Sequence, residues 1–519
     1  MKKSINLIAA IDAQYGISKN GNIPWHLKDD LKYFYNKTVT TQNSSKINAV
    51  IMGKNSWKTI PNNLRGLSKR LNVVVSSTMS DSELKKDNNT NTPTILSRSL
   101  KTALNNCQNN EKVESIYICG GASIYKEALN MGIIDRCYIT TIYKDFNCDN
   151  YFPIESFNNY INNTNITVNI DNETTYLNKT NNTNHINDTN DTNDINYKFN
   201  CYNINYNNKD EYQYLELLKQ ILNTDNKGRN TRNAPTYSIF GPQIEFNLQN
   251  GFPLLTTKKM FWRGIVEELL FFLKGDTNSN HLTEKNVNIW VPNTTRDFLD
   301  SRKLYDYEIG DMGPMYGWNW RHCSADYMGM NSVYTNKGFD QLKDILLQLK
   351  NDPYSRRIMM SSFDPSNVIK SVLVPCHGIV IQFYVNDNIM DCKMYQRSSD
   401  SFLGLPFNIT SYALLMHILC KVTGYTPGKL IITLGDCHIY KDHKDVVLEQ
   451  ISRKPYKFPQ LNILKEFTFN THHLNNINNI NDSELWINNA ISYIESLTYD
   501  DFNVDNYFYH PLLKAQMYA

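Results

Sequence analysis

Short runs of apolar residues, separated by polar segments with helical spacing, recur along the first 155 residues of the chain. An apolar run of about four to eight residues that is bounded by turn-forming residues is typical of a buried strand. The pattern predicts five such strands, at residues 5–11, 49–52, 71–75, 115–119 and 136–142. The first part of the chain is therefore expected to alternate strands with helices.

The pattern changes beyond residue 155, where Asn and Thr dominate from about 157 to 208. Such sequence buries too little apolar surface to offset the entropy lost on ordering it, so we interpret about 157–195 as a disordered insertion. Because residues 197–204 alternate in the manner of a strand, the insertion is expected to interrupt a hairpin before the last strand of the first domain.

Helical spacing returns at Asp210, and a long mixed α/β region continues to Ala519. We therefore expect two domains, at residues 1–206 and 210–519. A length of 519 residues is sufficient for each domain to bury a core of its own.

Composition and charge serve here to argue against several classes of function. The formal net charge is +2, so no overall field points to nucleic acid or to an anionic membrane surface. The ten cysteines include no CxxC pair and no Cys/His cluster at metal-ligand spacing, which indicates free thiols in a reducing compartment. No apolar run approaches the ~20 residues of a membrane span. We expect a cytoplasmic protein without a metal site or a membrane anchor.

An acidic pair near residue 30 is the first candidate for chemistry. Residues 23–34 have the form of a helix start, in which Asp30 shares one face with apolar residues. A carboxylate on an apolar face is costly unless it meets a donor-rich ligand. We therefore expect Asp30 to face inward, toward a ligand, and its neighbour Asp29 to face solvent.

Two glycine turns follow expected strands. Gly53 precedes a helical segment, and the pair Gly120-Gly121 does the same after the run at 115–119. Backbone N–H groups at such a helix start can hold an anion. Arg70 and the pair Ser76-Ser77 stand at the ends of another expected strand, which strengthens the prediction of a phosphate site.

This combination resembles dihydrofolate reductase over essentially all of residues 1–206. The resemblance implies reduction of 7,8-dihydrofolate by NADPH on an open, mostly parallel sheet with helices. It implies that Asp30 binds the pteridine ring and helps to protonate N5, and that Arg70 pairs with the glutamate α-carboxylate. The other implied folate contacts are Ala10, Ile23, Leu31, Phe34, Ile60, Leu67 and Thr140. The implied NADPH contacts are Lys54, Ser76 and Ser77 at the 2′-phosphate, and Ser56, Gly120, Gly121, Ala122 and Ser123 along the pyrophosphate and nicotinamide.

The second domain contains a cysteine behind a proline, Cys376, followed by Arg397 and then Asn408. A nucleophilic thiol needs a nearby cation to hold its thiolate, and Arg397 can supply it and also clamp a phosphate. Asn408 offers a donor and an acceptor together, which suits the edge of a pyrimidine ring.

This ordered set resembles the active-site signature of thymidylate synthase, and further motifs extend the resemblance over residues 210–519, as a mixed α/β domain. It implies that dUMP and 5,10-methylenetetrahydrofolate react to give dTMP and dihydrofolate, with Cys376 adding to C6 of the uracil. Glu268 and Tyr316 are implied as catalytic groups for proton transfer. The implied dUMP contacts are Arg232, Arg356, Arg357, Gln396, Arg397, Ser398, Asp400, Asn408, His438 and Tyr440. The implied folate contacts are Trp290, Leu403 and Phe407, with Asp400 on the same side.

Two arginine assignments need separate comment. In the family, the pair that matches Arg356 and Arg357 reaches the phosphate of the neighbouring subunit, which implies a homodimer through this domain. The family's other phosphate arginine precedes a Thr-Gly-x-Gly stretch; this chain lacks those glycines and is one residue off in spacing, and Arg232 is chosen here over Arg229.

The leading hypothesis is a bifunctional dihydrofolate reductase–thymidylate synthase, because the second domain makes the substrate of the first. One alternative is a deoxypyrimidine hydroxymethylase on the same scaffold, although cytosine favours an aspartate where Asn408 stands. The other is an RNA-binding or scaffold protein with a relic site, and RNA contact is left open.

Overall fold

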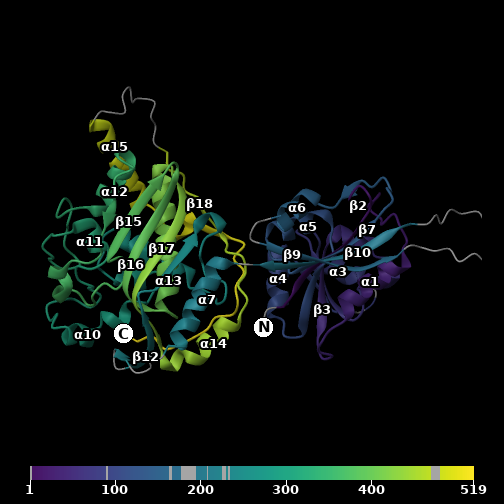
Figure 1. Cartoon of the computed structure of the whole chain (residues 1–519), viewed down its shortest axis with the longest axis horizontal. Coiled ribbons are helices and arrows are strands. Elements are labelled where there is room, and N and C mark those ends of the chain that lie inside the picture. Colours follow the sequence, from purple (N-terminus) through teal and green to yellow (C-terminus); the bar gives the residue numbers. More distant parts are fainter. Residues whose placement is uncertain are drawn as a thin grey trace, which may run out of the picture. The chain divides into compact units, whose positions relative to one another are not determined.

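The computed structural model describes residues 3–88, 90, 92–162, 166–176, 195–206, 208–224, 229–231, 234–468 and 480–518. The chain forms two compact units, Met1–Asn207 and Asn208–Ala519 (Figure 1). The division falls within the short interval that separates the two expected domains.

An eight-stranded sheet organises the first unit, in the order β5-β4-β3-β6-β1-β7-β10-β9. The strands from β5 to β7 in this order are parallel, whereas β10 and β9 are added antiparallel. Their bounds are β1 (Ile5–Ile11), β3 (Ile47–Gly53), β4 (Arg70–Val75), β5 (Thr94–Ser97), β6 (Val113–Ile118), β7 (Arg136–Ile142), β9 (Ile166–Tyr176) and β10 (Tyr197–Tyr206). The expected mostly parallel sheet is confirmed.

Helices follow most of these strands, as parallel connections require. They are α1 (Lys28–Val39), α2 (Lys54–Thr59), α3 (Asp81–Asp87), α4 (Leu100–Asn109), α5 (Ala122–Asn130) and α6 (Ile154–Asn162). Serine hydroxyls cap two of them: Ser80 accepts from the N–H of Glu83, and Ser99 accepts from the N–H of Thr102. The short strands β2 (Gly16–Ser18) and β8 (Asn150–Tyr151) pair with each other.

The interpretation of 157–195 as a disordered insertion is wrong for the residues of α6 and β9. Phe157 and Tyr160, three residues apart on α6, are both buried, so this segment has an apolar face that its Asn content concealed. Strand β9 pairs with β10 along its length, and the two form the expected hairpin. The rest of the expected insertion, 163–165 and 177–194, lies outside the described residues.

A second sheet organises the second unit, in the order β11-β12-β17-β16-β15-β14, with β13 also on β17. Strands β16 and β17 are parallel, and the other pairs are antiparallel. The bounds are β11 (Arg229–Thr231), β12 (Ala234–Phe240), β13 (Gln243–Asn247), β14 (Met359–Met360), β15 (Val380–Asn386), β16 (Ile389–Asp400) and β17 (Thr426–Tyr440). Strands β18 (Gln460–Ile463) and β19 (Phe502–Asp505) pair separately.

Helix α13 (Gly404–Thr423) is buried on almost all sides and lies in the core of this unit. It is the one helix among the described residues that is long and apolar enough to cross a membrane, but 83% of an 18-residue window within it is buried inside the unit, as in a core helix. The other helices are α7 (Lys209–Leu222), α8 (Trp262–Leu273), α9 (Asn280–Thr283), α10 (Arg296–Ser301), α11 (Gly317–His322), α12 (Gln341–Asn351), α14 (Lys444–Ser452) and α15 (Ile480–Glu495).

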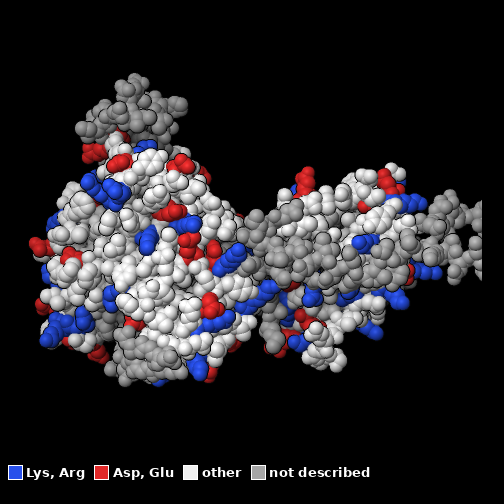
Figure 2. Space-filling view, in the orientation of Figure 1, with Lys and Arg blue, Asp and Glu red and all other residues white. Residues whose placement is uncertain are grey.

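Strand β15 shows that one face of this sheet is open. Ile381, Phe383 and Val385 are buried, whereas the alternating residues Val380 and Tyr384 are 40% and 63% exposed. On the face shown in Figure 2, acidic and basic side chains are interspersed over both units.

Candidate active sites

A cavity of about 1500 Å³ opens in the first unit at the carboxyl ends of β1, β3, β4, β6 and β7. This edge of a parallel sheet is where ligands commonly bind. Its lining includes every residue of this unit that the sequence assigns to folate: Ala10, Ile23, Asp30, Leu31, Phe34, Ile60, Leu67, Arg70 and Thr140. It also includes every residue assigned to NADPH: Lys54, Ser56, Ser76, Ser77, Gly120, Gly121, Ala122 and Ser123.

Asp30 lies on α1 and points toward β7, where the Thr140 hydroxyl donates a hydrogen bond of 2.7 Å to its Oδ1. Burial raises the pKa of the Asp30 carboxyl, and the bond from Thr140 opposes this shift. Asp29, one residue earlier, is exposed and accepts a 2.7 Å hydrogen bond from Tyr197. The inward carboxyl is thus the one placed to exchange a proton with a ligand.

Arg70 begins β4 and is only 4% exposed. Its guanidinium donates to the Thr38 hydroxyl at 2.6 Å and to the Ser68 carbonyl at 3.0 Å. Phe34 and Tyr35 lie beside it, with ring centroids 5.8 and 5.4 Å from its Cζ. A fixed, planar cation at a cavity wall is suited to a carboxylate.

The turn between β6 and α5 lies close to the start of α2. A Cβ added at Gly120, whose φ is +108°, would lie 3.0 Å from the Tyr125 ring, and one at Gly121 would lie 3.1 Å from Ser56 Oγ. Glycine therefore lets this backbone approach the wall that carries Ser56.

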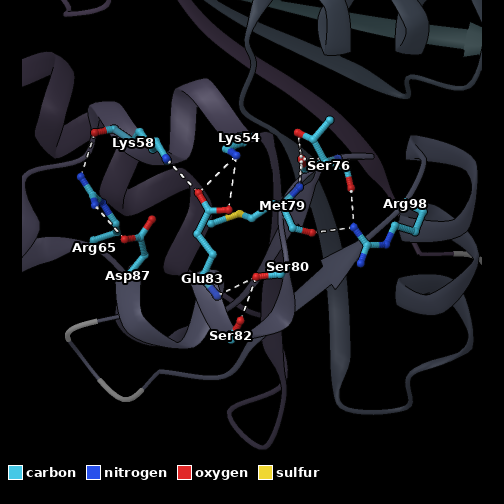
Figure 3. A network of polar contacts seen from close by, with 11 residues as sticks. Lys54, Lys58, Arg65, Ser76, Met79, Ser80, Ser82, Glu83, Asp87 and Arg98 are labelled. Atoms are coloured by element: carbon cyan, nitrogen blue, oxygen red, sulfur yellow. Dashed lines mark hydrogen bonds and ion pairs between the residues drawn. The ribbon is translucent and has the colours of Figure 1, made fainter.

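Cations gather where the cavity meets α2 and β4 (Figure 3). Lys54 and Lys58 both form ion pairs with Glu83, at 3.2 and 3.0 Å. Arg98 donates to the carbonyls of Ser76 and Met79, at 3.3 and 2.6 Å. Sequence reasoning missed Arg98, because it follows β5, a strand too short to stand out as an apolar run.

In the second unit, Cys376 lies on the loop before β15 and contacts Tyr316. The Cys376 N–H donates to the Tyr316 hydroxyl at 3.0 Å, and the same hydroxyl lies 3.4 Å from Sγ. Tyr316 has a φ of +46°, a conformation that costs on the order of 1–3 kcal/mol for a non-glycine residue. Its ring stacks on Phe272 and His377, at centroid distances of 5.0 and 4.4 Å, which hold it there.

Arg397 lies beside the same loop, as expected. Its guanidinium donates to the carbonyls of Pro375 and Val374, both at 2.8 Å, and its backbone N–H donates to the carbonyl of Cys376 at 2.9 Å. The side chain is otherwise exposed, so it can still meet an anion near the thiol.

Glu268 projects from α8 and is 8% exposed. It accepts a 2.9 Å hydrogen bond from Trp290 Nε1, and Trp290 in turn packs against Tyr316 with ring centroids 6.0 Å apart. Burial raises the pKa of Glu268 to about 7, against the effect of the Trp290 bond. The carboxyl is therefore poised to hold or release a proton near neutral pH.

The parallel pairing of β16 with β17 gathers the polar residues expected to hold a nucleotide. Its register sets Ser398 beside Asp436 and Asp400 beside His438. His438 Nδ1 lies 3.1 Å from Asp436 Oδ1, and its ring meets Tyr440 edge-on at 5.4 Å.

Gln396, on β16, donates a 3.0 Å hydrogen bond to Oδ1 of the buried Asn408 on α13. Its Oε1 is buried and has no hydrogen-bond partner among the described residues. Asp400 accepts from the N–H groups of Phe402 and Leu403, both at 3.0 Å, and so fixes the turn into α13. Leu403 and Phe407 pack against the core beside this turn.

Two expected arginines make no described contact with this group. Arg356 and Arg357 are exposed and form no ion pair within the described part of the chain, and the Arg356 carbonyl accepts from Gln382 on β15. Arg232 lies outside the described residues, and for Arg229 only the backbone is described.

One further feature, Lys258, was not found from the sequence. Lys258 is buried against the ring and carbonyl of Phe402, and burial lowers the pKa of its ammonium to about 7, opposed by Asp400. The C-terminal segment docks beside Tyr440. The rings of Tyr440 and Tyr518 stack with centroids 4.2 Å apart, and the Tyr518 hydroxyl donates a 2.7 Å hydrogen bond to Asp442.

Two family models match the chain. The one described as Thymidylate synthase matches residues 212–519, and the one described as Dihydrofolate reductase matches residues 4–185. A bifunctional dihydrofolate reductase-thymidylate synthase of Arabidopsis thaliana is 38% identical over 480 residues, which cover 90% of this chain and 84% of that protein. Those of Leishmania major and Plasmodium chabaudi are both 34% identical, covering 99% and 97% of this chain and 95% and 94% of those proteins.

Proposed function

The chain belongs to the bifunctional dihydrofolate reductase–thymidylate synthase family, and from this premise we propose which of its residues carry each reaction. It methylates dUMP to dTMP and reduces dihydrofolate to tetrahydrofolate. The hydroxymethylase and relic-site alternatives are not favoured, because relatives that match most of the chain are named as bifunctional enzymes.

We assign the cavity of the first unit to dihydrofolate and NADPH. NADPH supplies the hydride, and the protein positions the reactants. Asp30 holds the pteridine ring and moves a proton toward N5, for which its raised pKa is suited. Arg70 binds the glutamate carboxylate of the folate. The cations and hydroxyls around Lys54, Ser76 and Ser77 fit a phosphate group chemically.

In the second unit, Cys376 Sγ is proposed to add to C6 of dUMP, which makes C5 a nucleophile toward the methylene carbon of 5,10-methylenetetrahydrofolate. The Tyr316 hydroxyl, within 3.4 Å of Sγ, serves proton transfer at this centre. Asn408, oriented by Gln396, reads the uracil edge, and Glu268 passes a proton to or from the ring. Arg397, Ser398, His438 and Tyr440 hold the phosphate and ribose.

We also propose a homodimer built on the open face of the second sheet. Val380 and Tyr384 expose apolar and aromatic surface at alternating positions of β15, and a second copy would cover it. Arg356, next to this strand, would then reach the partner's nucleotide phosphate. We place the enzyme in the cytoplasm, in keeping with its ten free cysteines.

The observation that carries the proposal is the first unit's cavity, which is lined by every residue of that unit that the sequence assigns to folate and NADPH. The test is to incubate the protein with dUMP, methylenetetrahydrofolate and NADPH and to follow dTMP formation and NADPH oxidation. Both products should accumulate, and NADPH oxidation should depend on dUMP. A protein that forms neither product would contradict the proposal.

A further inference from the structure

An acidic side chain, Glu83, pairs with two lysines that line the cationic end of the first cavity, although it does not line the cavity itself. Glu83 stands in the first turn of α3, where Ser80 caps the helix, and its carboxylate bridges Lys54 and Lys58 of α2 (Figure 3). Hydrogen bonds from Lys58 and Lys54 lower the pKa of Glu83, so the bridge is between charged groups at neutral pH.

The surroundings of this bridge are otherwise built for an anion. Lys54, Lys58 and Arg98 line the cavity here together with the hydroxyl-bearing residues Ser76, Ser77, Thr78 and Ser99. Arg98 is already oriented by the carbonyls of Ser76 and Met79. Among the described residues, Glu83 is the acidic residue that contacts these lysines, and it forms an ion pair with each of them.

A phosphate monoester carries a charge near −2 at neutral pH. If it binds Lys54, it lies on an ammonium that Glu83 already contacts at 3.2 Å, so the two anions repel each other across a shared cation. An ammonium is a compact point charge with three donors. It can therefore bind the Glu83 carboxylate and the phosphate together, but it binds the phosphate less favourably than it would if the carboxylate were absent.

We propose that Glu83 is a specificity-determining residue that weakens binding of the 2′-phosphate of NADPH and so limits the preference for NADPH over NADH. This inference rests on the proposed assignment of Lys54, Ser76 and Ser77 to that phosphate. Glu83 holds the two lysines in place between catalytic cycles, and the phosphate must compete with it for them.

Two ligands isolate the contribution of the phosphate: 2′,5′-ADP, which carries it, and 5′-AMP, which does not. Their dissociation constants are measured by titration calorimetry on the full chain. The Glu83→Gln variant keeps an acceptor for the lysines and removes the charge. We expect it to bind 2′,5′-ADP about three- to tenfold more tightly than the wild type, with 5′-AMP binding unchanged.

Asp87→Asn is the matched control. Asp87 is on the same helix and forms an ion pair with Arg65 at 3.8 Å, but Arg65, unlike Lys54 and Lys58, does not line the cavity. It should change the affinity for neither ligand. An equal gain in this variant would show a general charge effect and overturn the assignment to Glu83.

Unchanged or weaker 2′,5′-ADP binding in Glu83→Gln would also overturn the inference and would show that Glu83 only positions the lysines. The underlying assignment has a separate test in the wild type and in Lys54→Met. If the wild type binds 2′,5′-ADP no better than 5′-AMP, the phosphate does not bind at this end, and the assignment fails together with the inference. If it does prefer 2′,5′-ADP and Lys54→Met loses that preference, the assignment stands whatever Glu83→Gln does.

Discussion

The Tyr316 hydroxyl accepts the backbone N–H of Cys376 at 3.0 Å and lies 3.4 Å from its Sγ. One phenol therefore fixes the loop that carries the thiol and also lies against the thiol itself. Of the ten cysteines, Cys376 is the one that combines this contact with an adjacent arginine.

Cys376→Ala should reduce dTMP formation to background, because no other thiol can take its place at C6. NADPH-dependent reduction of dihydrofolate should persist, since that cavity is in the other unit. Cys323→Ala is the control, because Cys323 is also partly exposed but lies outside the proposed site. Substantial dTMP synthesis in Cys376→Ala would remove the nucleophile assignment.

Asp30→Asn should lower the reductase rate at neutral pH by about 10²-fold or more, because the amide cannot carry the proton. Trapping of 5-fluoro-dUMP at Cys376 should be unaffected. Asp29→Asn, which alters the exposed neighbour, should change the rate little. Equal effects of the two substitutions would mean that Asp30 has no special role.

Asn408→Asp should weaken turnover of dUMP and improve that of dCMP. A carboxylate only accepts hydrogen bonds, whereas uracil O4 needs a donor and cytosine N4 needs an acceptor. An unpaired buried polar group costs about 1–3 kcal/mol, which is roughly ten- to a hundredfold in kcat/KM. The kcat/KM ratio for the two nucleotides is the measurement, and an unaltered ratio would show that Asn408 does not read the base.

Neither a Cys376→Ala homodimer nor an Arg356→Ala homodimer should make dTMP efficiently if Arg356 acts in the partner's site. Heterodimers of the two variants should recover activity, because one of their two sites has both an intact cysteine and an intact arginine. Activity is measured after co-expression, with heterodimers verified by differential tagging. Purely additive activity would show that Arg356 does not cross the interface.

Glu268 should make the stability of the second unit depend on pH. Its pKa is about 7 in the folded state against an ordinary value of 4.5, so the protonated form is favoured by folding. The associated stability is fully present below pH 4.5 and is lost as the pH rises to about 7, at no more than about 1.4 kcal/mol per pH unit.

Glu268→Gln should remove this dependence. Urea unfolding of both proteins from pH 5 to pH 8 gives the difference in unfolding free energy, which should shift in favour of the variant as the pH rises. A difference that stays constant over this interval would mean that Glu268 titrates normally.

The elements of the fold that could be predicted from the sequence are those marked by a pattern within a few neighbouring residues. The apolar runs at 5–11 and 136–142 coincide with β1 and β7, because a strand buried on both faces needs continuous apolar residues. Strand β5 has only four residues and no such run, so it was missed together with Arg98, which follows it. Composition averaged over a long window likewise concealed α6.

Site residues followed the same rule. Asp30 and Cys376 were found because each stands in a short motif with a distinctive neighbour. Lys258 was not, because what makes it unusual is the ring and carbonyl of Phe402, 144 residues away in the chain. Contacts at that separation are created by the fold and leave no trace in the spacing of residues.

The parallel register of β16 and β17 has a consequence for how this chain can change over time. Successive residues of a strand face opposite sides of the sheet. Deleting or inserting one residue in β16 before Gln396 would therefore exchange the buried position of Gln396 and the exposed position of Arg397. It would also displace Ser398 and Asp400 from Asp436 and His438. Single replacements at exposed positions of these strands leave this register intact, whereas the nucleotide contacts proposed for Ser398 and Asp400 require a fixed number of residues between Ile389 and Asp400.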